Sequence, residues 1–150
     1  MSWRECRGDE HEPIAALMLA LYEEDPAPTP MTRSQALATL QRLAREPVRG
    51  LALGYDRGEG LEGYALLCSF WSNELGGEVC IVDELYVAPG ARGRGAATGL
   101  LEGLIRRRWP WFQVAVAFEL EVTPGNAKAR ALYERLGFSA YKNALMRHRR

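Results

Sequence analysis

Apolar residues recur along the chain with two alternating periods, one typical of helices and one typical of strands. The helical period predicts helices over 9–23, 32–46, 94–108 and 126–136. Thr32 followed by Gln35 has the pattern of a capping box at the start of the second helix. Gly137 stands where a glycine commonly ends a helix, so we expect the last helix to stop there.

Between these helices lie apolar stretches with the length and turn signals of strands. They predict strands over 48–55, 61–71, 78–88, 112–123 and 138–147. Three prolines make 25–30 extended or turn-like, because proline cannot continue a helix. With a further strand before the first helix, the expected order is β-α-α-β-β-β-α-β-α-β, that of one mixed α/β domain spanning 1–150, with no linker dividing it.

Composition narrows the class of protein. The 150 residues carry 19 basic and 19 acidic side chains, and this balance argues against a dedicated nucleic-acid binder. No apolar run approaches the roughly 18 residues that a membrane helix needs, and the N-terminus lacks the apolar core of a secretory signal. The three scattered cysteines fit reduced thiols, and no Cys or His pair has metal-ligand spacing. We therefore expect a cytoplasmic protein with no metal site and no membrane or nucleic-acid partner.

A glycine-rich turn joins the strand that ends near Val87 to the helix that follows. Gly93 and Gly95 leave room for backbone to approach a ligand closely, and the free N–H groups of a helix N-terminus attract anions. Arg92 and Arg94 add two cations. The segment predicts a site for an anion the size of a pyrophosphate, although a plain turn with solvated arginines is the simpler alternative. It is not a P-loop, because no Gly-Lys-Ser/Thr follows.

Two signatures in this order resemble those of the GCN5-related N-acetyltransferases, the GNAT family. The first is Arg92-x-x-Gly95-x-Ala97, and the second runs from Asn126 through Leu132-Tyr133 to Gly137-Phe138. The resemblance covers about 63–147 well and the first 60 residues in layout only. It implies a mixed, mostly antiparallel central sheet with splayed parallel strands, flanked by about four helices.

The resemblance also implies acetyl-coenzyme A as the cosubstrate and places it on particular residues. Leu85, Tyr86 and Val87 would lie along its pantetheine arm, and Asn126 would contact it. The pyrophosphate would be held by the residues of the glycine-rich turn, namely Arg92, Gly93, Arg94, Gly95, Ala96, Ala97 and Thr98. Tyr133 would sit beside the sulfur and protonate the leaving thiolate, whereas without the resemblance it is equally a packing residue.

Asp83 and Glu84 are the candidates for the general base that takes the proton of the attacking amine. On a regular strand, adjacent residues face opposite sides, so only one would face the substrate unless a bulge alters the order. Asp83 matches the position of the base in the spermidine/spermine acetyltransferase branch, and Glu84 matches the acidic position of many other members. Tyr22 and Glu23 resemble a polyamine-contacting pair of the same branch; the alternative is an exposed acidic helix end.

The sequence thus predicts an N-acetyltransferase that acts on a primary amine of a small, cationic acceptor by direct attack. Two alternatives stay open. One is acetylation of a protein or an aminoglycoside, and the other is a catalytically silent module that binds acyl-coenzyme A. A homodimer is the assembly to consider.

Overall fold

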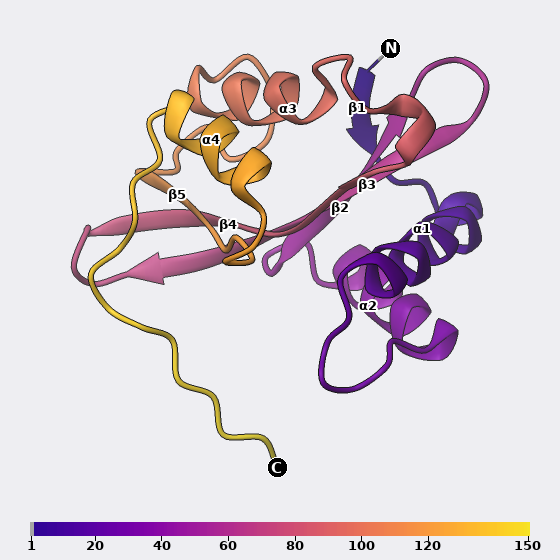
Figure 1. The fold of residues 1–150 in the computed structure, drawn as a ribbon, viewed down its shortest axis with the longest axis horizontal. Helices are drawn as coiled ribbons and strands as arrows, with labels where there is room; N and C mark the ends of the chain where they lie inside the picture. The colour runs from indigo at the N-terminus through magenta and orange to yellow at the C-terminus, as the bar shows by residue number, and fades with distance from the viewer. Residues whose placement is uncertain (1) are drawn as a thin grey trace.

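A computed structural model describes residues 2–150, which form one sheet and four α-helices (Figure 1). The strands are β1 (Ser2–Glu5), β2 (Gly50–Asp56), β3 (Leu61–Ser72), β4 (Gly77–Val87) and β5 (Ala117–Leu120). The α-helices are α1 (His11–Glu24), α2 (Arg33–Arg45), α3 (Ala96–Ile105) and α4 (Ala127–Arg135). Two 3-10 turns, η1 (Gly8–Glu10) and η2 (Pro89–Ala91), precede α1 and α3.

The sheet has the strand order β1-β2-β3-β4-β5, in which the first four strands are antiparallel to their neighbours. β5 lies parallel to β4. The expected mixed, mostly antiparallel sheet flanked by four helices is therefore confirmed. The parallel pairing covers only Val79–Val82 of β4, so the five residues of that strand after Val82, 83–87, have no partner on the β5 side.

Helices cover both faces of the sheet and produce two hydrophobic cores (Figure 1). On one face, α1 and α2 pack Ile14, Met18 and Leu40 against the sheet, and all three are almost fully buried. On the other face, α3 buries Leu100 and Leu104 against the opposite side chains of the same strands. This burial of apolar area is the main stabilising contribution to the fold.

A β-bulge in β4 reverses which side chains face which core. Leu66 of β3 pairs with Glu84, but the next residue, Leu67, pairs with Val82, so Asp83 is the extra residue. Before the bulge, Val82 faces the α3 side, whereas after it Tyr86 faces the α1 side. A regular strand would have kept these even-numbered residues on one face.

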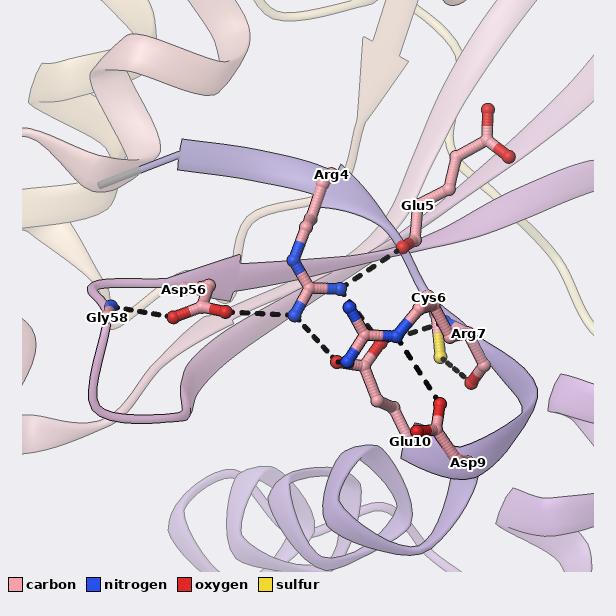
Figure 2. A network of polar contacts seen from close by, with 8 residues as sticks. All are labelled: Arg4, Glu5, Cys6, Arg7, Asp9, Glu10, Asp56 and Gly58. Atoms are coloured by element: carbon pink, nitrogen blue, oxygen red, sulfur yellow. Dashed lines mark hydrogen bonds and ion pairs between the residues drawn. The ribbon is translucent and has the colours of Figure 1, made fainter.

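A network of charged side chains fixes the start of α1 to the sheet (Figure 2). Arg4 of β1 donates to both carboxylate oxygens of Glu10, at 2.9 and 2.6 Å, and to Asp56 at 2.9 Å. Glu10 also accepts from the backbone N–H of Arg7, and the Arg4 guanidinium lowers its pKa to about 2. Because α1 is anchored at this end, its other end, with Tyr22 and Glu24, has a defined position over β4.

The structure corrects several element predictions. The expected strand over 138–147 is wrong, since those residues form neither helix nor strand and extend away from the sheet (Figure 1). The strand predicted over 112–123 is limited to β5, because the residues before it form turns. Thr32 does cap α2 by accepting from Gln35 N–H, but no reciprocal bond from the Gln35 side chain completes the box. Gly137 ends α4 as predicted, with φ of 94°.

Candidate active site

A cleft of about 1570 Å³ opens where β4 and β5 diverge. Its walls come from the C-terminal half of β4, the end of α1, the glycine-rich turn before α3, and α4 with the loop before it. Beyond Val82 the β4 backbone has no parallel neighbour, so the edge at Leu85, Tyr86 and Val87 faces this cleft. An extended ligand arm can pair with such an edge as a further strand would.

The glycine-rich turn forms one end of the cleft and has the features of an anion site. Gly93 and Gly95 have φ of 75° and 80°, a region that other residues adopt only with strain, and a Cβ on either would meet no atom within 4 Å. Gly95 is the N-cap of α3, and no side chain caps this end. The N–H groups of Ala96, Ala97 and Thr98 therefore lack intrahelical acceptors and are available to an anion.

A buried tryptophan on β1 holds this helix end in place. The indole N–H of Trp3 donates to the Ala96 carbonyl oxygen at 2.9 Å, and the side chain is only 4% exposed. Sequence reasoning missed this contact, because nothing in the local pattern relates residues 93 positions apart. Trp3 thus fixes the start of α3 although it does not itself line the cleft.

The two arginines of the turn have different positions. Arg92 lines the cleft, and one of its terminal guanidinium nitrogens donates to both carboxylate oxygens of Glu24 at the end of α1, at 2.9 and 2.7 Å. Its Nε donates to the Val87 carbonyl oxygen, and its guanidinium lies 5.5 Å from the centre of the Tyr86 ring. Arg94 is exposed and lies outside the cleft lining. The ion pair joins the anion end of the cleft to the C-terminal end of α1.

The carboxylate of Glu84 is held by two tyrosines on the α1 side of the sheet. Tyr22 of α1 donates to it at 2.5 Å and Tyr64 of β3 donates at 2.8 Å. Burial raises the pKa of both phenols, and the nearby carboxylate raises it further. Both hydroxyls therefore stay protonated and serve as donors to Glu84. Tyr64 was not among the predicted residues, since only the strand register brings it to Glu84.

Asp83 has a different environment although it is the adjacent residue. Because it is the bulged residue of β4, it also lines the cleft, and it makes no hydrogen bond or ion pair within residues 2–150. The side chain is exposed to solvent at the mouth of the cleft, but partial desolvation by the cleft walls still raises the pKa of its carboxyl, the nearby Glu121 raises it further, and Arg147 lowers it. The bulge thus brings both candidate bases to one cleft but leaves only Asp83 without a partner.

Tyr133 and Asn126 come from the opposite wall, on α4 and its N-cap. Tyr133 lines the cleft, and burial raises the pKa of its hydroxyl, so the group is protonated at neutral pH. Its hydroxyl makes no hydrogen bond within the described residues, while its ring packs near Phe138. Asn126 caps α4 by accepting from Ala129 N–H at 3.1 Å, which leaves its amide NH₂ free to face the cleft.

Comparison with known proteins agrees with this arrangement. Residues 14–138 match the Acetyltransferase (GNAT) family. The chain belongs to this family. No curated protein sequence is significantly similar to this GNAT acetyltransferase.

Solved structures share the fold of this acetyltransferase at low sequence identity. Aminoglycoside N-acetyltransferase AAC(6′)-Iy, in complex with CoA, is 17% identical with a TM-score of 0.78, over 99% of this chain and 94% of the other. A predicted acetyltransferase of Clostridium acetobutylicum, solved with acetyl-CoA, is 14% identical with a TM-score of 0.74, over 98% and 95%. Ribosomal-protein-alanine N-acetyltransferase of Brucella melitensis is 20% identical with a TM-score of 0.68, over 99% and 100%.

The cosubstrate of the enzyme is acetyl-coenzyme A, and the cleft fits it. The free N–H groups and the open space over Gly93 and Gly95 suit its pyrophosphate, and the unpaired edge at 85–87 suits its pantetheine arm. Tyr86 itself turns its ring into the core, where it is 6% exposed, so only its backbone is available to the cosubstrate. Of the turn residues predicted for this role, all except Arg94 line the cleft.

The two residues predicted to bind the acceptor, Tyr22 and Glu23, differ in their position relative to the cleft. Tyr22 lines the cleft, whereas Glu23 is exposed and lies outside its lining. The next two acids face inward: Glu24 pairs with Arg92, and Asp25 accepts a hydrogen bond from Thr123 at 3.0 Å. Glu121 and Arg147, which were not predicted, also line the cleft. Across residues 2–150 no helix could span a membrane, and no group of three or more His, Cys, Asp or Glu side chains could hold a metal ion.

Proposed function

We propose that this acetyltransferase acetylates a primary amine of a small, cationic acceptor, with Asp83 as the general base and Tyr133 as the general acid. The observation that carries the proposal is the unpaired Asp83 carboxylate on one wall of the cleft, with an unpaired Tyr133 hydroxyl lining the same cleft from α4. A proton acceptor and a proton donor are the two groups that acyl transfer to an amine requires.

The base is needed because the acceptor amine is protonated at neutral pH. An amine with a pKa of about 10.4 loses its proton at pH 7 at a cost of about 4 to 5 kcal/mol. Bound acetyl-coenzyme A supplies the thioester carbonyl that the free amine attacks. Asp83, directly or through one water, receives the amine proton. Its raised pKa makes it a better proton acceptor than an ordinary aspartate.

Glu84 has a positioning role in this proposal. Two tyrosine hydroxyls already occupy its carboxylate oxygens, at 2.5 and 2.8 Å. Because both oxygens already accept a hydrogen bond, the carboxylate is occupied by its tyrosine partners and less available to the acceptor amine. Its bonds hold the end of α1, and hence Tyr22, at a fixed position over the cleft.

Tyr133 completes the proton transfer on the other side of the reacting carbon. As the carbon–sulfur bond breaks, the departing thiolate takes the phenol proton, so no free thiolate accumulates. Burial keeps the phenol protonated until that step. Afterwards the phenolate regains a proton from solvent, and Asp83 releases its proton to solvent.

The preference for a cationic acceptor rests on the acids that line the cleft near Asp83. Glu84, Glu121 and Asp25 line the same cleft, and of the cations that also line it only Arg147 acts on the pKa of Asp83. A local excess of carboxylates attracts an acceptor with a second positive group, as in diamines of the spermidine/spermine kind. Aminoglycosides, after which one structural neighbour is named, are larger acceptors that are also positively charged.

An acceptor screen that measures free thiol release from acetyl-coenzyme A tests the proposal. Diamines, neutral monoamines, basic amino acids, an aminoglycoside and a peptide N-terminus should be compared at equal free-amine concentration. We expect the diamines to have the lowest KM, and that KM to rise with ionic strength because exposed charges are screened. Equal activity of neutral monoamines without salt dependence would contradict the charge preference. Cosubstrate binding without thiol release for any acceptor would favour a silent module.

A further inference from the structure

The segment after Gly137, which we call the tail (residues 138–150), contributes a cation to the acceptor side of the cleft. The tail has no helix or strand of its own, and its cations are Lys142, Arg147, Arg149 and Arg150. Of these four side chains, only Arg147 lines the cleft. Its guanidinium forms no ion pair with any carboxylate within residues 2–150. An arginine thus lies among the acids of the cleft without being bound to any one of them.

The charge of Arg147 acts on two groups of the acceptor side. Partial desolvation raises the pKa of the Asp83 carboxyl, and burial raises the pKa of the Tyr22 phenol. In both cases the positive charge of Arg147 opposes the rise. Asp83 belongs to β4 and Tyr22 to α1, so the guanidinium lies near the proposed base and also near the end of α1.

Two contacts, one on each side of Arg147, hold the tail in this place. The tail leaves α4 and passes the β3–β4 turn, where the Tyr141 hydroxyl donates to Glu74 at 3.1 Å (Figure 1). Near its end, Arg149 donates to the hydroxyl of Thr29 in the loop after α1. Both contacts are exposed, and residues 139–150 bury no side chain. Segments with few buried contacts open at low cost, so the tail is held in place but is easily released.

The guanidinium of Arg147 has the same charge as the second cationic group of the proposed acceptor. Both are attracted by the carboxylates that line this part of the cleft, Asp83 and Glu121 among them. Two like charges repel one another at short distance, so both cannot occupy the same carboxylates. Because Arg147 is tethered, its effective concentration at the cleft is on the order of millimolar, high enough to compete with a free cation.

We propose that the tail is an autoinhibitory strap, in which Arg147 occupies the position of the second cationic group of the acceptor until the acceptor displaces it. The inference rests on the proposed cationic acceptor and adds that the chain carries its own competitor. An acceptor with two cationic groups replaces the charge of Arg147 and releases the strap. A monoamine has no second cation with which to replace Arg147, so it leaves the strap in place.

NMR of the ¹⁵N-labelled full-length chain tests the displacement directly. The side-chain Nε–H signal of Arg147 is assigned by its loss in Arg147→Lys. Titration with 1,4-diaminobutane at constant ionic strength should shift and narrow this signal as the tail is released. Butylamine, which has the same carbon chain and one ammonium group, should need an about 5-fold higher concentration or more for the same change. An Arg147 signal that stays constant while diaminobutane saturates the cleft would overturn the proposal.

Two charge variants measure the competition. Arg147→Gln removes the competing cation and should lower the dissociation constant of diaminobutane by about 3- to 5-fold, the range of one exposed charge contact. Arg150→Gln is the matched control, because it removes the same charge from the same tail outside the cleft lining, and it should leave the constant unchanged. Weaker binding in Arg147→Gln would mean that Arg147 contacts the ligand, and equal effects of both variants would mean a general effect of tail charge. Either result would overturn the proposal.

A third variant separates a strap from a charge that acts without being anchored. Tyr141→Phe keeps every charge but removes the hydrogen bond to Glu74, and it should tighten diaminobutane binding by about 2-fold, as expected for one exposed hydrogen bond. An unchanged dissociation constant would overturn the strap. All these measurements are made without acetyl-coenzyme A, so they do not depend on proton transfer to Asp83. Displacement of the tail without thiol release in the enzyme assay would refute the proposed reaction and leave the strap standing.

Discussion

β3 and β5 belong to the same sheet, yet their side chains are buried to different extents. Five consecutive residues of β3, Gly63–Leu67, are buried, whereas no residue of β5 is. Helices α3 and α4, which both line the cleft, differ in the same way. α3 buries five of its ten residues, including Leu100 and Leu104, and α4 buries none.

The difference divides the cleft into a firmly packed wall and a loosely packed wall. The anion site at Gly95 and the carboxylate of Asp83 belong to β4 and α3, whose side chains fill the core and which Trp3 and Tyr64 support. Tyr133 and Asn126 belong to α4, which contacts the core only through partly buried side chains. Catalysis requires the groups on the two walls to keep a fixed distance and orientation relative to one another. The packing of α4 is therefore the part of the site most sensitive to its surroundings.

The largest expected effect is the loss of kcat on substitution of Asp83, which lies on the firmly packed wall. Asp83→Asn removes the proposed base and should lower kcat by about 10²- to 10⁴-fold with little change in cosubstrate affinity. Glu84→Gln is the comparison, because it removes a carboxylate of the same cleft that is already bonded to two tyrosines. If Glu84→Gln reduced kcat more than Asp83→Asn, the two roles would be exchanged.

The pH dependence of kcat also tests the role of Asp83 as the base. Asp83 must be ionised to accept a proton, and its pKa is raised, so kcat should fall as pH decreases through a value above that of an ordinary aspartate. Glu121→Gln removes a charge that raises this pKa and should move the low-pH limb of kcat to lower pH. Glu119→Gln, on an exposed neighbouring residue outside the cleft lining, should leave the limb in place.

On the loosely packed wall, Tyr133→Phe removes the proposed acid and keeps the ring. We expect kcat to fall by about 10- to 10³-fold while the dissociation constant of acetyl-coenzyme A stays near that of the wild type. Calorimetry gives the second quantity and thiol release gives the first. An unchanged kcat with an active acceptor would return Tyr133 to a packing role.

A pair of leucine truncations measures the packing difference itself. Leu100→Ala in α3 empties a fully buried site and should lower the free energy of unfolding by about 2 to 5 kcal/mol. Leu132→Ala in α4 affects a half-buried side chain, so we expect a loss of about 1 kcal/mol. Urea denaturation at low protein concentration gives both values. Equal losses would show that the two walls are packed equally well.

The smallest expected effect concerns the ion pair that spans the cleft. Glu24→Gln frees Arg92 from a carboxylate that competes with the pyrophosphate, so acetyl-coenzyme A should bind up to about 5-fold more tightly, the range of an exposed ion pair. Glu23→Gln removes the same charge one residue earlier, outside the cleft lining, and should leave the dissociation constant unchanged. Weaker binding in Glu24→Gln would mean that the pair supports the site instead of competing for it.

Sequence patterns predicted most of the fold and much of the cleft. The four helices, the strands β2, β3 and β4 and the glycine-rich turn follow from local signals, namely apolar period, caps and glycines. The predictions failed where pairing partners lie far apart in sequence. The strand over 138–147 has strand-like residues, but within one chain no neighbouring strand pairs with it, and a strand without a partner does not form.

The sequence by itself determined the family, the cosubstrate and the identity of the candidate groups, because its two signatures place glycines, Asn126 and Tyr133 at fixed spacing. Only the tertiary structure separated Asp83 from Glu84. The reason is the bulge in β4, which depends on the register between β3 and β4 and which no local pattern encodes. That register turns one carboxylate toward Tyr22 and Tyr64 and leaves its neighbour free in the cleft.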